Sequence, residues 1–354
     1  MRPPQVGRNW LATHLPQAWL RRGPLSCALW PLSMLYAALA LGRRWMYDSG
    51  AWPSSRVRVP VVVVGNVVAG GSGKTPVVMA VVEHLRAQGW RPGVVSRGHG
   101  RLTREGLEVL PGLSARDCGD EPLLIRQRCQ VPVFVARQRV EATQALLQAH
   151  PETTIVVADD GLQHHALARD INIAVFDDRG TGNGWMLPAG PLREPWQPAR
   201  VNLVLHTGQH PAFAGFQASR TLAMHGQSAQ GQRVPLHSLH KQRLMALAGI
   251  AQPEVFFDML RQQGLRLEHT LALTDHHDCQ GLDLLSEPGW TLLCTEKDAV
   301  KLFPLYPDAG LRLLAVPLAC SPEPAFLQAL DELLAPLQHQ PPHPLPSPHG
   351  HPTS

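Results

Sequence analysis

The sequence has few cysteines and no paired cysteine motif. Six are present, and none is part of a C-x-x-C pair; they are Cys27, Cys118, Cys129, Cys279, Cys294 and Cys320. This spacing gives no support to a zinc site or to a dense disulfide framework. It favours a reduced, cytosolic protein.

A large net charge and an internal repeat are also missing. The formal charge is only +4 over 354 residues, which is too small to imply binding to nucleic acid. The hydrophobic content of 44% is ordinary for a globular protein. This length allows two compact domains, each with its own core.

Acidic residues are almost absent from the first 58 residues. Asp48 is the single acid there, against eight arginines, and the same stretch holds five of the nine tryptophans. Arginine beside tryptophan is typical of a membrane interface. We therefore predict that residues 1–55 form an N-terminal membrane-associated helical segment.

Within that segment, residues 23–42 carry no charge. Their length could span a bilayer, although Pro24 and Pro31 divide the stretch. We predict a helix that lies in, or is partly inserted into, the inner leaflet. Two alternatives stay open. One is a secretory signal, because Ala38-Leu39-Ala40 resembles a cleavage site, and the other is a plain buried helix.

A glycine-rich loop follows a strand predicted at 59–64. The loop leads to Lys74-Thr75 and to a helix predicted at 76–88, which Pro76 opens at its first position. Such a loop turns backbone N–H groups toward an anion, while Lys74 reaches the β- and γ-phosphates and Thr75 holds Mg²⁺. The residues predicted to bind the phosphates are Val68, Ala69, Gly70, Gly71, Ser72, Gly73, Lys74 and Thr75.

One position departs from the strict phosphate-loop pattern, since Val68 stands where glycine is expected. The alternative is a glycine-rich turn between a strand and a helix, with no ligand. We take the loop to bind a nucleoside triphosphate.

Apolar strands alternate with helices over residues 56–215, which predicts a doubly wound, mainly parallel sheet of the phosphate-loop NTPase type. Residues 216–240 read as a linker or crossover. A smaller C-terminal α/β domain is predicted at 241–337, with its last helix near 323–336. The Pro- and His-rich tail at 338–354 is expected to be disordered.

Polar pairs stand at the predicted strand ends. Asp159-Asp160 closes an apolar strand and is suited to Mg²⁺, or is a simple turn. Asp120-Glu121 belongs to a site or caps the next helix. Arg193-Glu194, between prolines, clamps phosphate and metal or forms a surface ion pair. For His276-His277 three interpretations are open: the pair binds a metal, one of the two accepts a proton, or both lie in a loop without a function.

Seven motifs occur in order along the chain. They are Gly65-Asn66 with Gly70-Gly71-Ser72-Gly73-Lys74-Thr75-Pro76, Ser96-Arg97-Gly98, Gly119-Asp120-Glu121-Pro122, Asp159-Asp160-Gly161, Leu192-Arg193-Glu194-Pro195, Asp275-His276-His277-Asp278 and Thr295-Glu296-Lys297-Asp298-Ala299-Val300-Lys301. Together they resemble the tetraacyldisaccharide 4′-kinase family of Gram-negative lipid A biosynthesis, over roughly residues 15–335. Two departures are visible: His99 stands in place of a usual tyrosine, and Leu162 in place of a common phenylalanine.

The resemblance implies transfer of the γ-phosphate of ATP to the 4′-hydroxyl of tetraacyldisaccharide 1-phosphate, giving lipid IV-A. It implies that Asp120 is the general base, assisted by His276 or His277. Residues implied to serve ATP and Mg²⁺ are Lys74, Thr75, Asp159, Asp160, Arg193 and Glu194.

The implied partners are the lipid substrate and the inner-membrane surface, on its cytoplasmic face; a monomer is expected. Two rival classes remain. A regulatory GTPase or assembly factor would want an Asn-Lys-x-Asp element, whereas Thr295-Glu296-Lys297-Asp298 puts lysine directly before aspartate. A membrane-tethered protein that holds nucleotide without turnover would not need Asp120.

Overall fold

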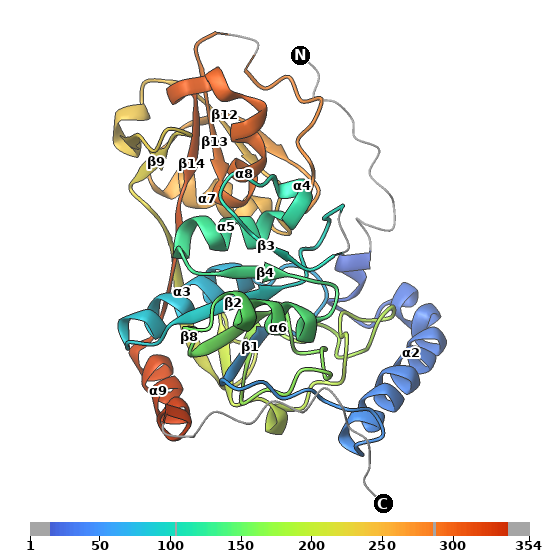
Figure 1. Ribbon diagram of the computed structural model, residues 1–354. Coiled ribbons are helices and arrows are strands. Elements are labelled where there is room, and N and C mark those ends of the chain that lie inside the picture. The colour runs from blue at the N-terminus through green and yellow to red at the C-terminus, as the bar shows by residue number, and fades with distance from the viewer. Residues whose placement is uncertain (1–14, 103–104, 286–287, 339–354) are drawn as a thin grey trace, which may run out of the picture.

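The computed structural model describes residues 15–102, 105–285 and 288–338. Within them the chain forms two α/β domains, each built on its own sheet (Figure 1). The predicted tail at 338–354 lies outside the described residues except for its first position, as do residues 1–14 of the predicted N-terminal segment.

The first sheet has nine strands in the order β15-β8-β7-β6-β1-β5-β2-β4-β3. The six strands from β7 to β4 in this order pair in parallel. In chain order, the first seven strands all belong to this sheet. They are β1 (Val61–Gly65), β2 (Pro92–Ser96), β3 (Leu107–Glu108), β4 (Val133–Val135), β5 (Ile155–Asp159), β6 (Ile171–Phe176) and β7 (Leu203–His206). The predicted doubly wound, mainly parallel sheet is confirmed.

Both faces of this sheet are covered, which explains why β1 is apolar throughout rather than alternating. Val62 and Val64 face one core, whereas Val61 and Val63 face the other. The helices between β1 and β7 are α3 (Lys74–Ala87), α4 (Ala115–Cys118), α5 (Asp120–Cys129), α6 (Arg139–Ala149) and the short η1 (Pro198–Arg200). Because the strands are parallel, their carboxyl ends share one edge, and the polar motifs gather there.

The second sheet has six strands in the order β10-β9-β14-β13-β11-β12. Its strands are β9 (His225–Gln227), β10 (Arg233–Pro235), β11 (Arg243–Ala248), β12 (Leu267–Ala272), β13 (Trp290–Thr295) and β14 (Leu313–Val316). Its helices are η2 (Leu236–Leu239), α7 (Pro253–Gln262), α8 (Glu296–Leu305) and η3 (Pro307–Arg312). Two apolar cores, one on each side, fill this domain.

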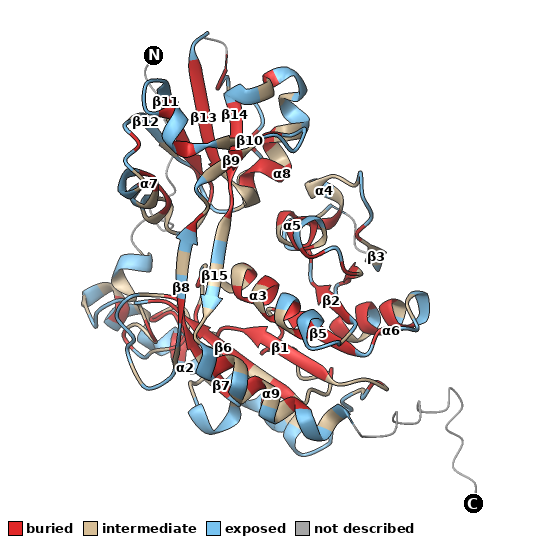
Figure 2. Ribbon diagram, turned by 90° about the vertical axis from the view of Figure 1, so that its left-hand side faces the viewer, coloured by how far each residue is buried: buried red, intermediate tan, exposed pale blue. Residues whose placement is uncertain are grey.

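Two antiparallel strands, β8 (Phe216–Leu222) and β15 (Leu318–Pro322), run between the domains (Figure 2). The chain leaves the first domain through β8 and returns through β15. The last helix, α9 (Pro324–Gln338), then packs on the first sheet, where Phe326 and Leu330 are fully buried. The predicted domain limits differ from this arrangement: residues 318–338 belong to the first domain, and 216–240 contain strands of both sheets. The apolar stripe of α9 does not say which sheet it covers.

Helix α2 (Pro24–Asp48) continues through Pro31 and lies along the outside of the first domain (Figure 1). It is the one described helix that is long and apolar enough to cross a membrane. Only 11% of its most apolar 18-residue stretch is buried. The alternative of a plain buried helix is therefore wrong. The hydrogen bonds that hold the helix include those from Ser33 Oγ to the Met186 carbonyl (2.7 Å) and from Tyr36 Oη to the Arg193 carbonyl (3.0 Å).

Candidate active site

The glycine-rich loop lies between β1 and α3, at the carboxyl edge of the first sheet. Helix α3 begins at Lys74, two residues before the predicted start, so Lys74 and Thr75 form its first turn. Pro76 is tolerated at the third position because the first four N–H groups of a helix have no partner within it. Gly73 has a φ of 74°, which favours glycine. The loop and the helix N-terminus together make an anion-binding site.

A cavity of about 180 Å³ opens between this loop and the second domain. The loop contributes Gly71, Ser72, Gly73, Lys74 and Thr75 to its polar end. Val68, Ala69 and Gly70 do not line this cavity. The opposite wall is apolar and comes mainly from α7, with Val255, Phe256 and Met259. A polar end beside an apolar wall suits the phosphates and the base of a nucleotide.

Asp159 ends β5 and is 1% exposed. Its Oδ2 accepts a hydrogen bond from Ser96 Oγ at 3.0 Å, whereas its Oδ1 has no hydrogen-bond partner in the described part of the chain. Burial, together with the negative charges of Glu121 and Asp160, raises the pKa of Asp159 to about 7. A buried carboxylate oxygen without a donor fits a bound cation.

Asp160 has a φ of 49°, and its carboxylate contacts two positively charged side chains. Its carboxylate lies 3.5 Å from Lys74 Nζ and 3.0 Å from an Arg193 guanidinium nitrogen. Burial alone would raise the pKa of Asp160, but Lys74 and Arg193 outweigh it and lower the pKa to about 2. The structure therefore brings together three of the predicted residues, from three separate motifs.

The residues at this edge fit Mg²⁺ that is bound jointly by protein and substrate phosphates, and they do not fit a metal ion bound by protein side chains alone. Among residues 15–102, 105–285 and 288–338, no group of three or more His, Cys, Asp or Glu side chains could hold a metal ion. Mg²⁺ characteristically uses one or two carboxylates together with substrate phosphates and water. Asp159, Asp160 and Thr75 supply such a partial set beside the loop.

Glu194 does not join this set. Its Oε1 accepts a hydrogen bond from Gln163 Nε2 at 2.8 Å, and its Oε2 lies 3.9 Å from His165 Nε2. It lines a different cavity, of about 270 Å³, next to Arg44 of α2. The prediction of Glu194 beside the loop thus differs from the structure, because neighbouring positions in a motif do not fix where two side chains point.

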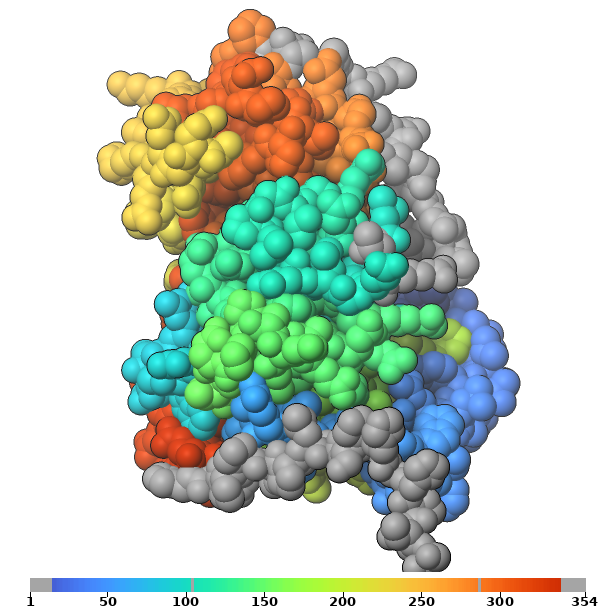
Figure 3. Space-filling model, viewed as in Figure 1, coloured from blue at the N-terminus to red at the C-terminus, as the bar shows by residue number. Residues whose placement is uncertain are grey.

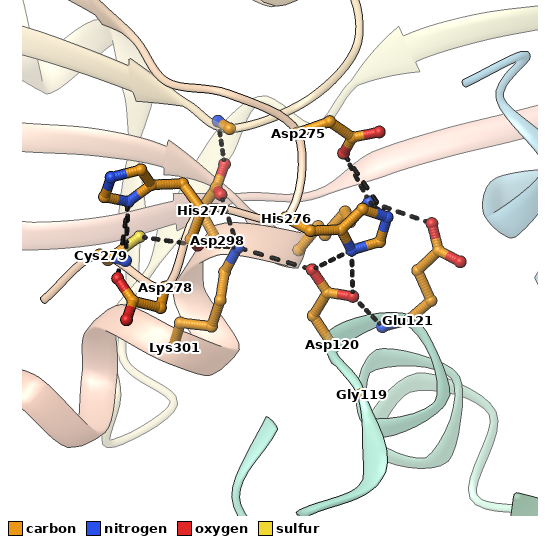
Figure 4. Close-up of polar contacts among 12 residues, drawn as sticks. Gly119, Asp120, Glu121, Asp275, His276, His277, Asp278, Cys279, Asp298 and Lys301 are labelled. Carbon is orange, nitrogen blue, oxygen red and sulfur yellow. Dashed lines mark hydrogen bonds and ion pairs between the residues drawn. The ribbon is translucent and has the colours of Figure 1, made fainter. Parts of the chain in front are cut away.

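Asp120 forms the first residue of α5 and is 5% exposed. Its two carboxylate oxygens lie 3.0 and 3.1 Å from Nδ1 of His276, which follows β12 in the second domain (Figure 4). Lys301 Nζ lies 3.5 Å from Oδ2. Burial raises the pKa of Asp120, but the His276 hydrogen bond and the nearby lysines outweigh it and lower the pKa to about 2.

Of the two predicted histidines, only His276 reaches Asp120. The hydrogen bond that His276 donates to the Asp120 carboxylate raises the pKa of His276, although burial opposes it. His276 also lies against the ring of His99, with centroids 4.9 Å apart. His277 instead accepts a hydrogen bond from the Cys279 backbone N–H at its Nδ1 (2.9 Å), so it orders the loop.

Two lysines of α8 surround the Asp120–His276 pair, and sequence reasoning gave them no role. Lys297 and Lys301 are four residues apart and so share one helix face. Lys297 Nζ lies 3.0 Å from Glu121 Oε1 and 3.3 Å from His276 Nε2. Thr295 caps the helix by accepting a hydrogen bond from the Asp298 N–H. The lysine spacing within this motif was the signal that could have identified them.

Asp120 and Lys74 line neighbouring cavities rather than one. Asp120 faces a cavity of about 200 Å³ with His99, His276 and Lys301. Helix α5 packs beside α8 at this contact, and the domains touch along it (Figure 3). Glu121 and Lys297 line the cavity of Lys74 and lie directly beside Asp120 and His276. The ion pair of these two residues therefore stands between the two cavities.

Comparison with known proteins identifies the family. The family described as tetraacyldisaccharide-1-P 4′-kinase matches residues 25–335. Tetraacyldisaccharide 4′-kinase of Polaromonas naphthalenivorans is 58% identical, over 96% of this chain and 99% of the relative. That of Acidovorax sp. (strain JS42) is 56% identical, over 92% and 96%. The crystal structure of LpxK from Aquifex aeolicus in complex with ATP has a TM-score of 0.75 at 28% identity, covering 88% of this chain and 99% of that one. The predicted resemblance is confirmed: the chain belongs to the tetraacyldisaccharide-1-P 4′-kinase family.

Proposed function

We propose that this chain transfers the γ-phosphate of ATP to the 4′-hydroxyl of tetraacyldisaccharide 1-phosphate, giving lipid IV-A. In this proposal Asp120 orients that hydroxyl and accepts its proton. The observation that carries the assignment of roles is the Asp120–His276 pair, which joins the two domains in the cavity next to that of the phosphate loop.

Asp120 orients the hydroxyl and takes its proton late in the reaction. With a pKa of about 2, its carboxylate is charged at neutral pH and accepts a hydrogen bond from the alcohol. Phosphoryl transfer passes through a loose transition state in which little negative charge must be created on the attacking oxygen beforehand. A weakly basic but well-placed carboxylate therefore suffices, and His276 holds it in place.

The donor end is held by α3 and its loop. Backbone N–H groups of the loop and Lys74 Nζ bind the β- and γ-phosphates, and Arg193 adds a positive charge beside Asp160. Mg²⁺, when bound, neutralises charge that develops on the phosphate oxygens. Thr75, Asp159 and Asp160 would hold it; Glu194 is left out because it lines another cavity.

The lipid substrate explains α2. Its exposed apolar side chains include Leu32, Leu35 and Leu39, which are 55%, 58% and 67% exposed. Burial of such a row in a membrane releases apolar surface from water. The helix thus holds a monomeric enzyme on the cytoplasmic face of the inner membrane, where the disaccharide of an acylated substrate reaches the site.

The test uses radiolabelled ATP with tetraacyldisaccharide 1-phosphate in detergent, and follows a product with a second phosphate. Asp120→Asn should lose at least 100-fold in turnover while ATP affinity changes little, because the variant keeps its shape but loses its charge. His277→Gln is the matched control and should stay within a few-fold of the parent. If Asp120→Asn transfers phosphate at the parental rate, the assignment is wrong. ATP hydrolysis without lipid phosphorylation would favour the NTPase alternative.

A further inference from the structure

Carbonyl groups of the phosphate loop are each held by a separate side chain. The Gly71 carbonyl accepts a hydrogen bond from the Arg179 guanidinium at 2.7 Å, and the Ser72 carbonyl accepts one from Thr207 Oγ1 at 3.0 Å. A longer contact of 3.4 Å joins Asn66 Nδ2 to the Gly70 carbonyl. A loop whose N–H groups face an anion must turn its carbonyls the other way, and buried carbonyls need donors there.

Arg179 is the charged member of these donors, and its position is fixed. Its Nε lies 3.0 and 2.9 Å from the two carboxylate oxygens of Asp177, which follows β6 directly. The Asp177 side chain is 7% exposed and the Arg179 side chain 24%. A guanidinium can bind a carboxylate and a carbonyl at once because its donors form a rigid fork. The pair therefore ties β6 to the loop after β1, two adjacent strands.

The second domain contacts the same pair. Gln252, just before α7, donates a hydrogen bond from Nε2 to Asp177 Oδ2 at 3.2 Å. Its neighbour Ala251 comes so close to the loop that a Cβ atom on Gly71 would lie 2.9 Å from the Ala251 Cβ. Gly71 therefore meets the first domain through its carbonyl and the second domain through its open α-carbon face.

From these contacts we propose that Arg179 is a positioning residue for the triphosphate, and that Asp177 links its orientation to the second domain through Gln252. Arg179 keeps the Gly71 carbonyl turned outward, so that the loop N–H groups stay directed at the phosphates. Gln252 strengthens this arrangement only when the second domain is seated on the loop. The inference deepens the proposed function, and it concerns nucleotide binding before any phosphate is transferred.

The experiment measures nucleotide affinity of the full chain in detergent without lipid substrate, so its outcome does not depend on which alcohol is phosphorylated. Arg179→Gln should weaken binding of ATP and ADP by at least 10-fold, and leave AMP within 2-fold, because AMP has no β-phosphate for the loop. Arg179→Lys should recover only part of the loss, since one ammonium cannot replace the fork. Arg261→Gln, which breaks an exposed pair with Asp258 on α7, is the matched control and should change nothing.

The link to the second domain is tested by a double-mutant cycle. Gln252→Ala should weaken ATP binding about 3-fold in the parent and have no effect in the Arg179→Gln background. Equal effects of Gln252→Ala in both backgrounds would overturn the link. Unchanged ATP affinity in Arg179→Gln, or an equal loss for AMP and ATP, would overturn the positioning role. If Arg179→Gln does not fold, the affinity series and the cycle are run with Arg179→Lys, where an unchanged ATP affinity would overturn the positioning role and an undiminished effect of Gln252→Ala would overturn the link.

Discussion

Replacing His276 with Gln probes how much the contact between the domains depends on charge. His276 Nδ1 lies 3.0 Å from the buried Asp120 carboxylate, and the partner domains supply one residue each. The pKa of Asp120 falls from an ordinary 3.8 to about 2, which corresponds to roughly 2 kcal/mol in favour of its charged form. His276, Lys297 and Lys301 together provide this stabilisation of the Asp120 charge. We therefore expect His276→Gln to lose about 1 kcal/mol of unfolding free energy at pH 6.

The loss should depend on pH, with a sign fixed by the pKa of His276. Because that pKa is raised above 6.5 in the folded chain, protonation of His276 stabilises the fold fully below pH 6.5. This contribution disappears as the pH rises through the raised pKa. Asp120 stays charged throughout this range, since its own contribution is lost only as the pH falls through about 2.

Urea unfolding at pH 6 and pH 9 measures the difference between parent and variant. The loss in His276→Gln should be clearly larger at pH 6. His277→Gln is the control, because His277 bonds to a backbone N–H rather than to Asp120. A loss that is equal at both pH values, or that grows with pH, would refute a charged His276–Asp120 pair.

Three further perturbations follow from the structure. Asp159→Asn removes the charge of a buried carboxylate with a free Oδ1, so a magnesium titration of turnover should need at least 10-fold more Mg²⁺; an unchanged requirement would exclude Asp159 as a ligand. Changing Leu35 and Leu39 to Gln removes two exposed apolar side chains of α2, and flotation with anionic vesicles should show weaker membrane binding while activity on detergent-dispersed substrate is retained. Phe326→Ala opens the core under α9, where Phe326 is 0% exposed, and should cost roughly 3–5 kcal/mol in chemical unfolding; a loss below about 1 kcal/mol would contradict its placement in that core.

The sequence predicted the central sheet and its loop because these are local patterns. A run such as residues 61–64, apolar and β-branched, is typical of a strand buried on both faces. The loop glycines and Lys74 occupy a few adjacent positions, and this short pattern by itself predicts phosphate binding. Asp159, Asp160 and Arg193 could be expected together because they stand after strands or rigid turns that meet at one edge.

What the sequence could not predict depends on partners far along the chain. His276 rather than His277 contacts Asp120, a residue 156 positions earlier in the chain, and adjacent positions in one motif do not distinguish the two histidines. Arg179 belongs to none of the seven motifs, and the role proposed for it rests on its contact with Gly71 across two strands. The limits of the domains also depend on where α9 packs, since an amphipathic helix satisfies either sheet equally well.

The return of the chain through β15 has a consequence for synthesis. Phe326, Leu330 and Leu334 fill the core beneath the first sheet, yet they are among the last residues of the described chain to be made. Strands β7 and β8, on which α9 packs, leave the ribosome about 110 residues earlier, so their apolar face stays uncovered while the whole second domain is translated. We expect nascent chains that stop before Pro324 to need chaperone protection, and C-terminal truncations there to aggregate even though every proposed active-site residue is present.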